Sequence, residues 1–201
     1  MTDVLPATPE GIAAAATLLR QGAIVAFPTD TVYGVGVSAA DPSRTDALFA
    51  LKDRPADRLI PMLVADLAQV ADAGWVVDER ATRLAARFWP GALTLVLPGP
   101  GRPQAFRAPD DTVALELIRA AGPLFTTSAN RSDEPDTLGA DEVLIAFATQ
   151  QDELAAVIDG GPSRGGVPST VVDLTVTPAR LLRAGAIGPL EVSEVVDLET
   201  A

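Results

Sequence analysis

The sequence contains no cysteine and no histidine, and it has one lysine and one tyrosine among 201 residues. The absence of cysteine and histidine excludes disulfides, thiolate nucleophiles, imidazole acid–base catalysis and the usual structural zinc sites. If the protein is an enzyme, its chemistry must use hydroxyls, carboxylates, arginines, Lys52, backbone amides or a cation bound through oxygen.

Long apolar runs are also absent. No segment approaches the roughly 18 apolar residues that suggest a membrane-spanning helix, and the N-terminal MTDVLPATPEG lacks the layout of a signal peptide. We therefore expect a cytoplasmic protein with no membrane partner. The formal charge of −12 disfavours extensive direct nucleic-acid binding, which needs several Lys and Arg side chains on phosphates. A small cationic pocket remains compatible with that charge.

Length and composition predict one domain over residues 1–201, because 201 residues with 48% apolar content can bury one sizeable core. Apolar spacing and capping residues predict helices at 10–21, 42–52, after Asp66, and at 78–88, 112–122 and 140–149. Apolar runs predict strands at 23–27, 60–65, 92–97, 123–130, 155–159, 169–174 and 179–185. Several late strands follow one another without helices, which indicates an α/β (α+β-like) fold with a mixed parallel and antiparallel sheet.

Two stretches place hydroxyl groups at the ends of predicted strands. FPTDTVYGVG (27–36) and TTSAN (126–130) both suit recognition of a small polar ligand, and the glycines of the first would let backbone approach it. On the first stretch alone, a tight hairpin whose Thr and Asp side chains satisfy turn amides is the favoured explanation. The alternative for the second is an N-cap or an Asx turn.

Cationic side chains mark two further stretches. Lys52 ends a predicted helix, where it would complement the helix dipole, yet with Arg54 it could instead bind a polyphosphate. From this segment alone the two explanations are about equal. Arg107 precedes a proline turn and could clamp a carboxylate, although a surface pair with Asp110 or Asp111 is the commoner arrangement.

Seven blocks, taken in order, resemble the YrdC family of L-threonylcarbamoyladenylate synthases. They cover the chain from about Gly22 to Gly188, and they are FPTDTVYGVG, KDRP, FWPGALTLVL, FRAP, GPLFTTSANRSDEP, PSTVVDL and LLRAGAIG. The resemblance implies the short, single-domain form of the family, with a twisted sheet, flanking helices and a central ligand cleft.

The resemblance also implies a reaction and its partners. L-threonine, bicarbonate and ATP would give threonylcarbamoyl-AMP and pyrophosphate, and the product would pass to the machinery that transfers threonylcarbamoyl to adenosine in tRNA. Mg²⁺ would accompany ATP, held largely by phosphate oxygens and water. Because the carbamate formed from threonine is already an anion, such chemistry needs no histidine base.

For ATP, the resemblance implies five residues. Lys52 and Arg54 would meet the phosphates as the catalytic residues. Ser128 and Asn130 would hold the nucleotide, and Arg183 would close on it from a distant strand. Asn130 as a folding cap is the alternative at that position.

For L-threonine, the resemblance implies a second group, with an arginine on the carboxylate. The group consists of Thr29, Arg107, Thr126 and Ser169, with Thr31 and Tyr33 as pocket walls. No residue is implied as a metal ligand.

The sequence departs from the family pattern at several positions. Leu59 stands where a proline is usual, Ala108 replaces a valine, Asp133 replaces a glycine, and Asp111 replaces a frequent histidine. The segment 98–105 is shorter than usual and leads directly into the FRAP block, so it could shift the arginine of that block.

Two other functions compete with the synthase. One is a non-catalytic paralogue of the YciO type that binds nucleotide or RNA on the same scaffold. The other is a docking partner within a tRNA-modifying assembly. The intact Lys-Asp-Arg and Ser-Ala-Asn blocks favour the enzyme over the paralogue, and the charge of −12 disfavours RNA as the main ligand. For the docking partner, the sequence offers no obvious interaction tail.

Overall fold

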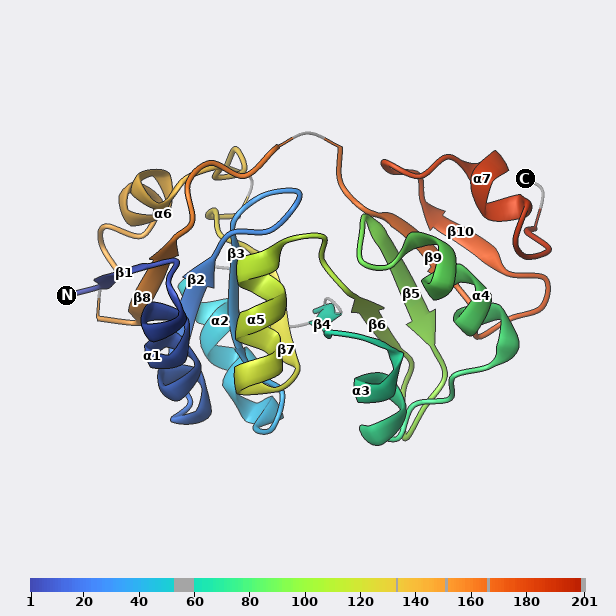
Figure 1. Ribbon diagram of the computed structural model, residues 1–201, viewed down its shortest axis with the longest axis horizontal. Coiled ribbons are helices and arrows are strands. Elements are labelled where there is room, and N and C mark those ends of the chain that lie inside the picture. Colours follow the sequence, from blue (N-terminus) through green and yellow to red (C-terminus); the bar gives the residue numbers. More distant parts are fainter. Residues whose placement is uncertain (53–59, 133, 151, 166, 200–201) are drawn as a thin grey trace.

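A mixed sheet runs the length of the molecule, and helices pack against it (Figure 1). The computed structural model describes residues 1–52, 60–132, 134–150, 152–165 and 167–199. Within these residues, ten strands follow the spatial order β1-β8-β2-β3-β7-β4-β6-β5-β9-β10. Their bounds are Asp3–Pro6 (β1), Ile24–Phe27 (β2), Gly34–Ser38 (β3), Met62–Leu63 (β4), Leu93–Leu97 (β5), Gln104–Arg107 (β6), Leu124–Ser128 (β7), Leu154–Asp159 (β8), Thr170–Asp173 (β9) and Arg180–Arg183 (β10).

Helices connect and cover these strands. They are α1 (Pro9–Arg20), the 3₁₀ turn η1 (Pro42–Arg44), α2 (Thr45–Leu51), α3 (Leu67–Asp72), α4 (Glu79–Phe88), α5 (Thr112–Ala121), α6 (Ala140–Ala146) and α7 (Pro189–Ser193). In the described part of the chain, no helix is both long and apolar enough to cross a bilayer. The predicted α/β fold with a mixed sheet is confirmed, since β1/β8, β2/β8, β4/β6 and β5/β9 are parallel and the other pairs antiparallel.

The core lies on both faces of the sheet. Helices α1 and α5 cover one face at β2 and β8, where Leu19, Phe27 and Ile118 are fully buried. The opposite face packs against α2 and α6 through Leu48, Val143 and their neighbours. Because neighbouring residues of a strand point to opposite faces, β2 is buried along its whole length.

Local signals place most helix ends correctly. The side chain of Thr8 accepts a hydrogen bond from the Gly11 N–H at the start of α1, and Asp66 and Asp78 cap α3 and α4 in the same way. The chain leaves α1 through Gly22, whose φ of 84° favours glycine. These contacts bridge only a few residues, which is why the sequence predicts them.

Four elements were not predicted from the sequence: β1, β3, β6 and α7. Strand β3 explains two glycines that the sequence suggests would face a ligand. A Cβ on Gly36 would lie 2.9 Å from the Phe125 carbonyl oxygen, and one on Gly34 would lie 2.9 Å from Thr126 Cγ2. Both glycines therefore allow β3 to approach β7 closely, although Gly34 also lines the cleft described below.

Candidate functional site

A cleft of about 470 Å³ opens over the middle of the sheet. It lies between the loop 28–33 and β7 on one side, and β5, β10 and the residues just before β9 on the other. Its volume is in the usual range for small-molecule sites. It is lined by eight of the residues that the resemblance implies, namely Thr29, Thr31, Tyr33, Arg107, Thr126, Ser128, Ser169 and Arg183.

Arg107 lies at the end of β6 and reaches into the cleft while its guanidinium is held from behind. Nε donates to the Gly91 carbonyl (3.0 Å), Nη1 donates to Thr31 Oγ1 (3.2 Å), and Nη2 forms an ion pair with the Asp30 carboxylate. The alternative of a surface pair with Asp110 or Asp111 is wrong, because the partner is Asp30 and both side chains of the pair are at least 90% buried.

Arg183 approaches from β10, on the opposite side. Its Nε and Nη2 donate to the Ser169 carbonyl (3.0 and 2.8 Å), and Nη2 also donates to Ser169 Oγ (3.0 Å). Burial, and then repulsion from Arg107, lower the pKa of Arg183. Two cations therefore face the same cleft closely enough to interact, which is an arrangement that favours an anion between them.

The loop 28–33 forms the near wall. Thr29 Oγ1 donates to the Val32 carbonyl (2.6 Å) and accepts from the Thr31 N–H (3.2 Å), so the turn interpretation of this stretch is correct for its geometry. The same loop joins β2 to β3 as an antiparallel hairpin. Its side chains thus shape the turn and line the cleft at once.

Tyr33 ties this wall to the glycine-rich loop 160–165. Its hydroxyl donates to the Gly161 carbonyl (2.7 Å) and accepts from the Gly160 N–H (3.3 Å). Burial raises the pKa of Tyr33, so the phenol is neutral at physiological pH and remains a donor. Tyr33 is accordingly a fixed wall of the cleft.

Lys52 is at the C-cap of α2, as predicted, but its ammonium turns away from that helix toward β7. Nζ donates to the Ser128 carbonyl (2.5 Å), Ser128 Oγ (3.2 Å) and Asn130 Oδ1 (3.2 Å), and the residue is 4% exposed. Asn130 also donates from Nδ2 to the Glu134 carbonyl (2.6 Å), a contact that fastens its amide within the fold but is not an N-cap, in which the side-chain oxygen would accept a backbone N–H. Ser128 belongs both to this hydrogen-bond network and to the lining of the cleft.

Some implied positions are not brought to the cleft surface or lie outside the described residues. Lys52 and Asn130 stand behind Ser128 rather than in the lining. Arg54, Leu59 and Asp133 fall outside the residues that the structure describes.

The cleft also contains residues that the sequence did not single out. Thr94 in β5 shares a hydrogen bond of 2.8 Å with Ser169 Oγ, and Asp136 is the one carboxylate among the described lining residues. Pro61 and Leu63 add apolar surface. Thr94 sits inside an apolar strand, and its partner is 75 residues away, so nothing local marked it as a site residue.

The fold and the cleft together define an α/β protein with a preformed, hydroxyl-lined cleft into which two arginines project. The chain belongs to the Sua5/YciO/YrdC family, whose model, described as "Telomere recombination", matches residues 17–185. That match spans the cleft residues on both sides.

Several curated relatives are named threonylcarbamoyl-AMP synthase. The chain is 38% identical to the Bacillus subtilis protein over 98% of its own length and 39% identical to the Pyrococcus abyssi protein over 90%. It spans 59% and 56% of the length of these two relatives. A relative from Chromohalobacter salexigens is 33% identical, over 83% of this chain and 94% of that protein.

Solved structures agree on the fold. P. abyssi Sua5 complexed with L-threonine superposes with a TM-score of 0.89 at 35% identity, covering 99% of this chain and 62% of that one. Escherichia coli YciO superposes with a TM-score of 0.82, covering 96% of this chain and 99% of that one, at 23% identity, which supports the fold alone.

Proposed function

We propose that this chain is an L-threonylcarbamoyladenylate synthase, a nucleotidyltransferase that forms threonylcarbamoyl-AMP and pyrophosphate from L-threonine, bicarbonate and ATP. The observation that carries the proposal is the cleft between Arg107 and Arg183, two cations on opposite walls with hydroxyls between them. The names of the relatives, and the threonine in the P. abyssi Sua5 structure, support threonine and ATP as the anionic ligands of this cleft.

Arg107 would bind the threonine carboxylate. A guanidinium has five N–H donors, and three of the five are used by Gly91, Thr31 and Asp30. One donor on each of Nη1 and Nη2 remains, which is the number that a carboxylate accepts from an arginine fork. Pro61 and Leu63 would pack against the threonine methyl group.

The nucleotide phosphates would lie toward Arg183, Ser128 and Lys52. Arg183 Nη1 makes no hydrogen bond within the described residues, so it has donors for a phosphate oxygen. Lys52 Nζ already donates three hydrogen bonds, to Ser128 and Asn130, so it would act on a phosphate through its charge from behind Ser128. Arg54 would add a planar donor set.

The chemistry would then depend on positioning. The threonine nitrogen and bicarbonate carbon form the carbamate with loss of water, and a carbamate oxygen attacks the α-phosphorus while the bond to the leaving pyrophosphate breaks. The cationic side chains offset charge that develops on the phosphates, and the fixed cleft holds the two anions together. No step requires a histidine.

The cleft residues are compatible with a Mg²⁺ ion that is bound mainly through ATP. No cluster of three or more acidic groups among the described residues could hold a metal, and Asp136 is the single carboxylate of the described lining. That donor set suits an ion bound mainly by phosphates and water, with Asp136 as an outer contact. When bound, the ion would neutralise phosphate charge.

Incubating the purified chain with L-threonine, labelled bicarbonate and ATP should release pyrophosphate and yield labelled threonylcarbamoyl-AMP. Omission of threonine should abolish both products, which excludes simple ATP hydrolysis. ATP binding without product from folded protein would favour the non-catalytic paralogue instead. Transfer of the product to a partner that modifies tRNA belongs to the same proposal, and tRNA added to a reaction with such a partner would test it.

A further inference from the structure

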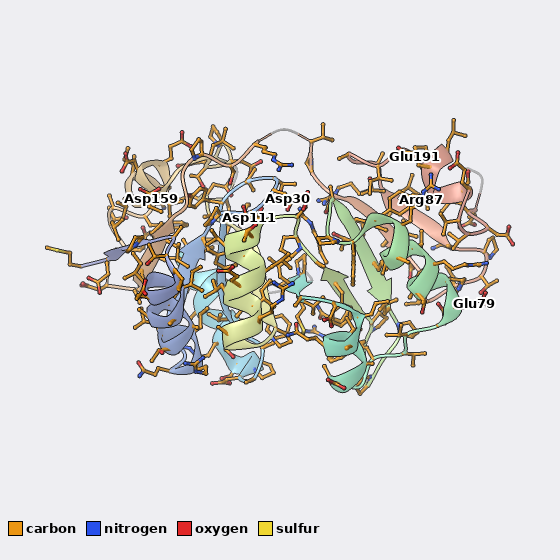
Figure 2. All side chains as sticks on the ribbon, viewed as in Figure 1. Asp30, Glu79, Arg87, Asp111, Asp159 and Glu191 are labelled. Carbon is orange, nitrogen blue, oxygen red and sulfur yellow. The ribbon has the colours of Figure 1, made fainter. Side chains whose placement is uncertain are left out.

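Thr94 in β5 belongs to the far wall of the cleft, opposite the loop that carries Asp30. In Figure 2, Asp30 lies near the middle of the molecule, and β5, β9 and β10, labelled in Figure 1, lie to the right of it. Thr94 is buried, and the other residues of β5 are leucines and a valine. Because valine is β-branched like threonine and packs well in strands, the packing of β5 alone gives no reason for a hydroxyl at this position.

The Thr94 hydroxyl has a different kind of partner from the other buried threonine hydroxyls. Among the described residues, each of the other four donates to a backbone carbonyl, as is usual for a hydroxyl that serves the fold. They are Thr29 (to Val32), Thr126 (to Leu124), Thr137 (to Ala129) and Thr170 (to Ile187). Thr94 Oγ1 bonds instead to Ser169 Oγ (2.8 Å), and it makes no other hydrogen bond within the described part of the chain. Its partner is a side chain that lines the cleft.

The number of donors and acceptors favours one direction for the bond between these two hydroxyls. A hydroxyl has one hydrogen and two acceptor positions, and Ser169 Oγ already accepts from Arg183 Nη2 (3.0 Å). If Ser169 donated to Thr94, the Thr94 hydrogen would have no acceptor among the described residues. A buried donor left unpaired costs about 1–3 kcal/mol, so Thr94 is favoured as the donor.

This direction determines what Ser169 can offer to a ligand. With Thr94 and Arg183 both donating to it, Ser169 Oγ has no acceptor position left and keeps one unpaired hydrogen. Arg183 also donates twice to the Ser169 carbonyl, which fixes the backbone of the serine. The far wall therefore presents an oriented O–H donor beside a guanidinium, a pair that suits an anionic oxygen.

We propose that Thr94 is a positioning residue that holds the Ser169 hydroxyl as a donor to the carbamate formed from threonine, a role that rests on the proposed function. The carbamate carbon is bonded to the threonine nitrogen, and one carbamate oxygen attacks the α-phosphorus. The carbamate must therefore lie between the threonine, whose carboxylate is assigned to Arg107, and the phosphates, which are assigned to Arg183. The Ser169 O–H donates to the oxygen that becomes the carbonyl oxygen of the product, and the other oxygen is left free to attack. The serine keeps its proton throughout.

Steady-state kinetics of Thr94→Val test this role, because valine matches the shape of threonine and lacks the hydroxyl. The Ser169 hydroxyl is then free to turn, so kcat/KM for bicarbonate should fall about tenfold, the effect of one hydrogen bond to a charged group. KM for ATP should change less than about twofold, because Arg183 keeps its bonds to the Ser169 carbonyl. The Kd of L-threonine, measured by calorimetry without bicarbonate, should also change less than about twofold, since no carbamate is present. Thr94→Ala should repeat these results, and Thr94→Ser should restore most of kcat/KM.

Thr170→Val is the matched control in the neighbouring strand β9. Thr170 is fully buried and follows Ser169 in the chain, but its hydroxyl donates to the Ile187 carbonyl (2.6 Å) and it does not line the cleft. Its loss should lower the melting temperature. Below that temperature, kcat/KM for bicarbonate should stay within about twofold of the wild type.

Three results would overturn the proposal for Thr94. They are an unchanged kcat/KM for bicarbonate in Thr94→Val, an equal fall in Thr170→Val, and an equal weakening of free L-threonine or ATP in Thr94→Val. The second and third would assign the effect to packing of the far wall. Absence of product from the folded wild type would contradict the proposed function together with this role, whereas an active wild type with an unaffected Thr94→Val would contradict this role alone.

Discussion

Arg107→Ala is expected to cost both folding stability and threonine binding. The substitution leaves the Asp30 carboxylate buried, with 8% of its side chain exposed, and without its cation. Breaking a buried pair in this way typically destabilises by about 3–5 kcal/mol. Threonine affinity should also fall by about 2–5 kcal/mol, or roughly 30-fold or more, because the substrate carboxylate loses its fork. Denaturant unfolding and calorimetric titration with L-threonine would measure the two effects.

A double variant separates the role of Arg107 in folding from its role in threonine binding. Asp30→Asn combined with Arg107→Ala removes the Asp30 charge that Arg107→Ala alone leaves buried and unpaired. Most of the stability should therefore return while threonine affinity stays low. Asp30→Asn alone keeps an acceptor for Arg107 and should bind threonine far better than the double variant. Recovery of threonine binding together with stability in the double variant would show that Arg107 acts on the fold and not on the substrate. Loss of ATP binding in place of threonine would mean that the pocket assignment is reversed.

The sequence predicts the parts of this fold that depend on local contacts. Thr8, Asp66 and Asp78 cap the helices that follow them, and each cap joins residues only three positions apart. The alternation of helices and strands and the mixed sheet were likewise readable, since apolar spacing reports burial directly.

Pairings between distant residues were not readable from one sequence. Arg107 and Asp30 are 77 residues apart, and the pattern around Arg107 favoured its neighbours Asp110 and Asp111 instead. Strand β6 was missed because it has only four residues and ends two residues before Pro109. Strand β3 was missed because its glycines suggest a loop, whereas in the fold they allow close packing against β7.

The position of Lys52 was predicted, but not the direction of its ammonium. Both explanations drawn from the sequence, a complement to the helix dipole or a phosphate ligand, place the charge near solvent. In the fold it is buried against Ser128 and Asn130. A substitution there must therefore affect the fold as well as any bound phosphate.

Lys52→Ala should lower turnover and stability together. Removing the ammonium leaves the Ser128 carbonyl with less hydrogen bonding, and an unsatisfied buried acceptor costs about 1–3 kcal/mol. If Lys52 also stabilises charge on the phosphates, kcat for pyrophosphate release should fall about 10²–10³-fold, as for other preorganised donors. Initial rates and thermal melts of the same preparation would test both expectations.

Arg44→Ala provides the matched control for Lys52→Ala. Arg44 Nε also fixes a distant carbonyl, that of Gly22 (2.8 Å), but Arg44 does not line the cleft. Its loss should cost about 1–3 kcal/mol of stability with turnover retained below the melting temperature. If Lys52→Ala behaves like this control, the lysine only fastens β7 to α2. If kcat of Lys52→Ala falls much further than kcat of Arg44→Ala at an equal folded fraction, the Lys52 ammonium stabilises the reacting phosphates from its position behind Ser128.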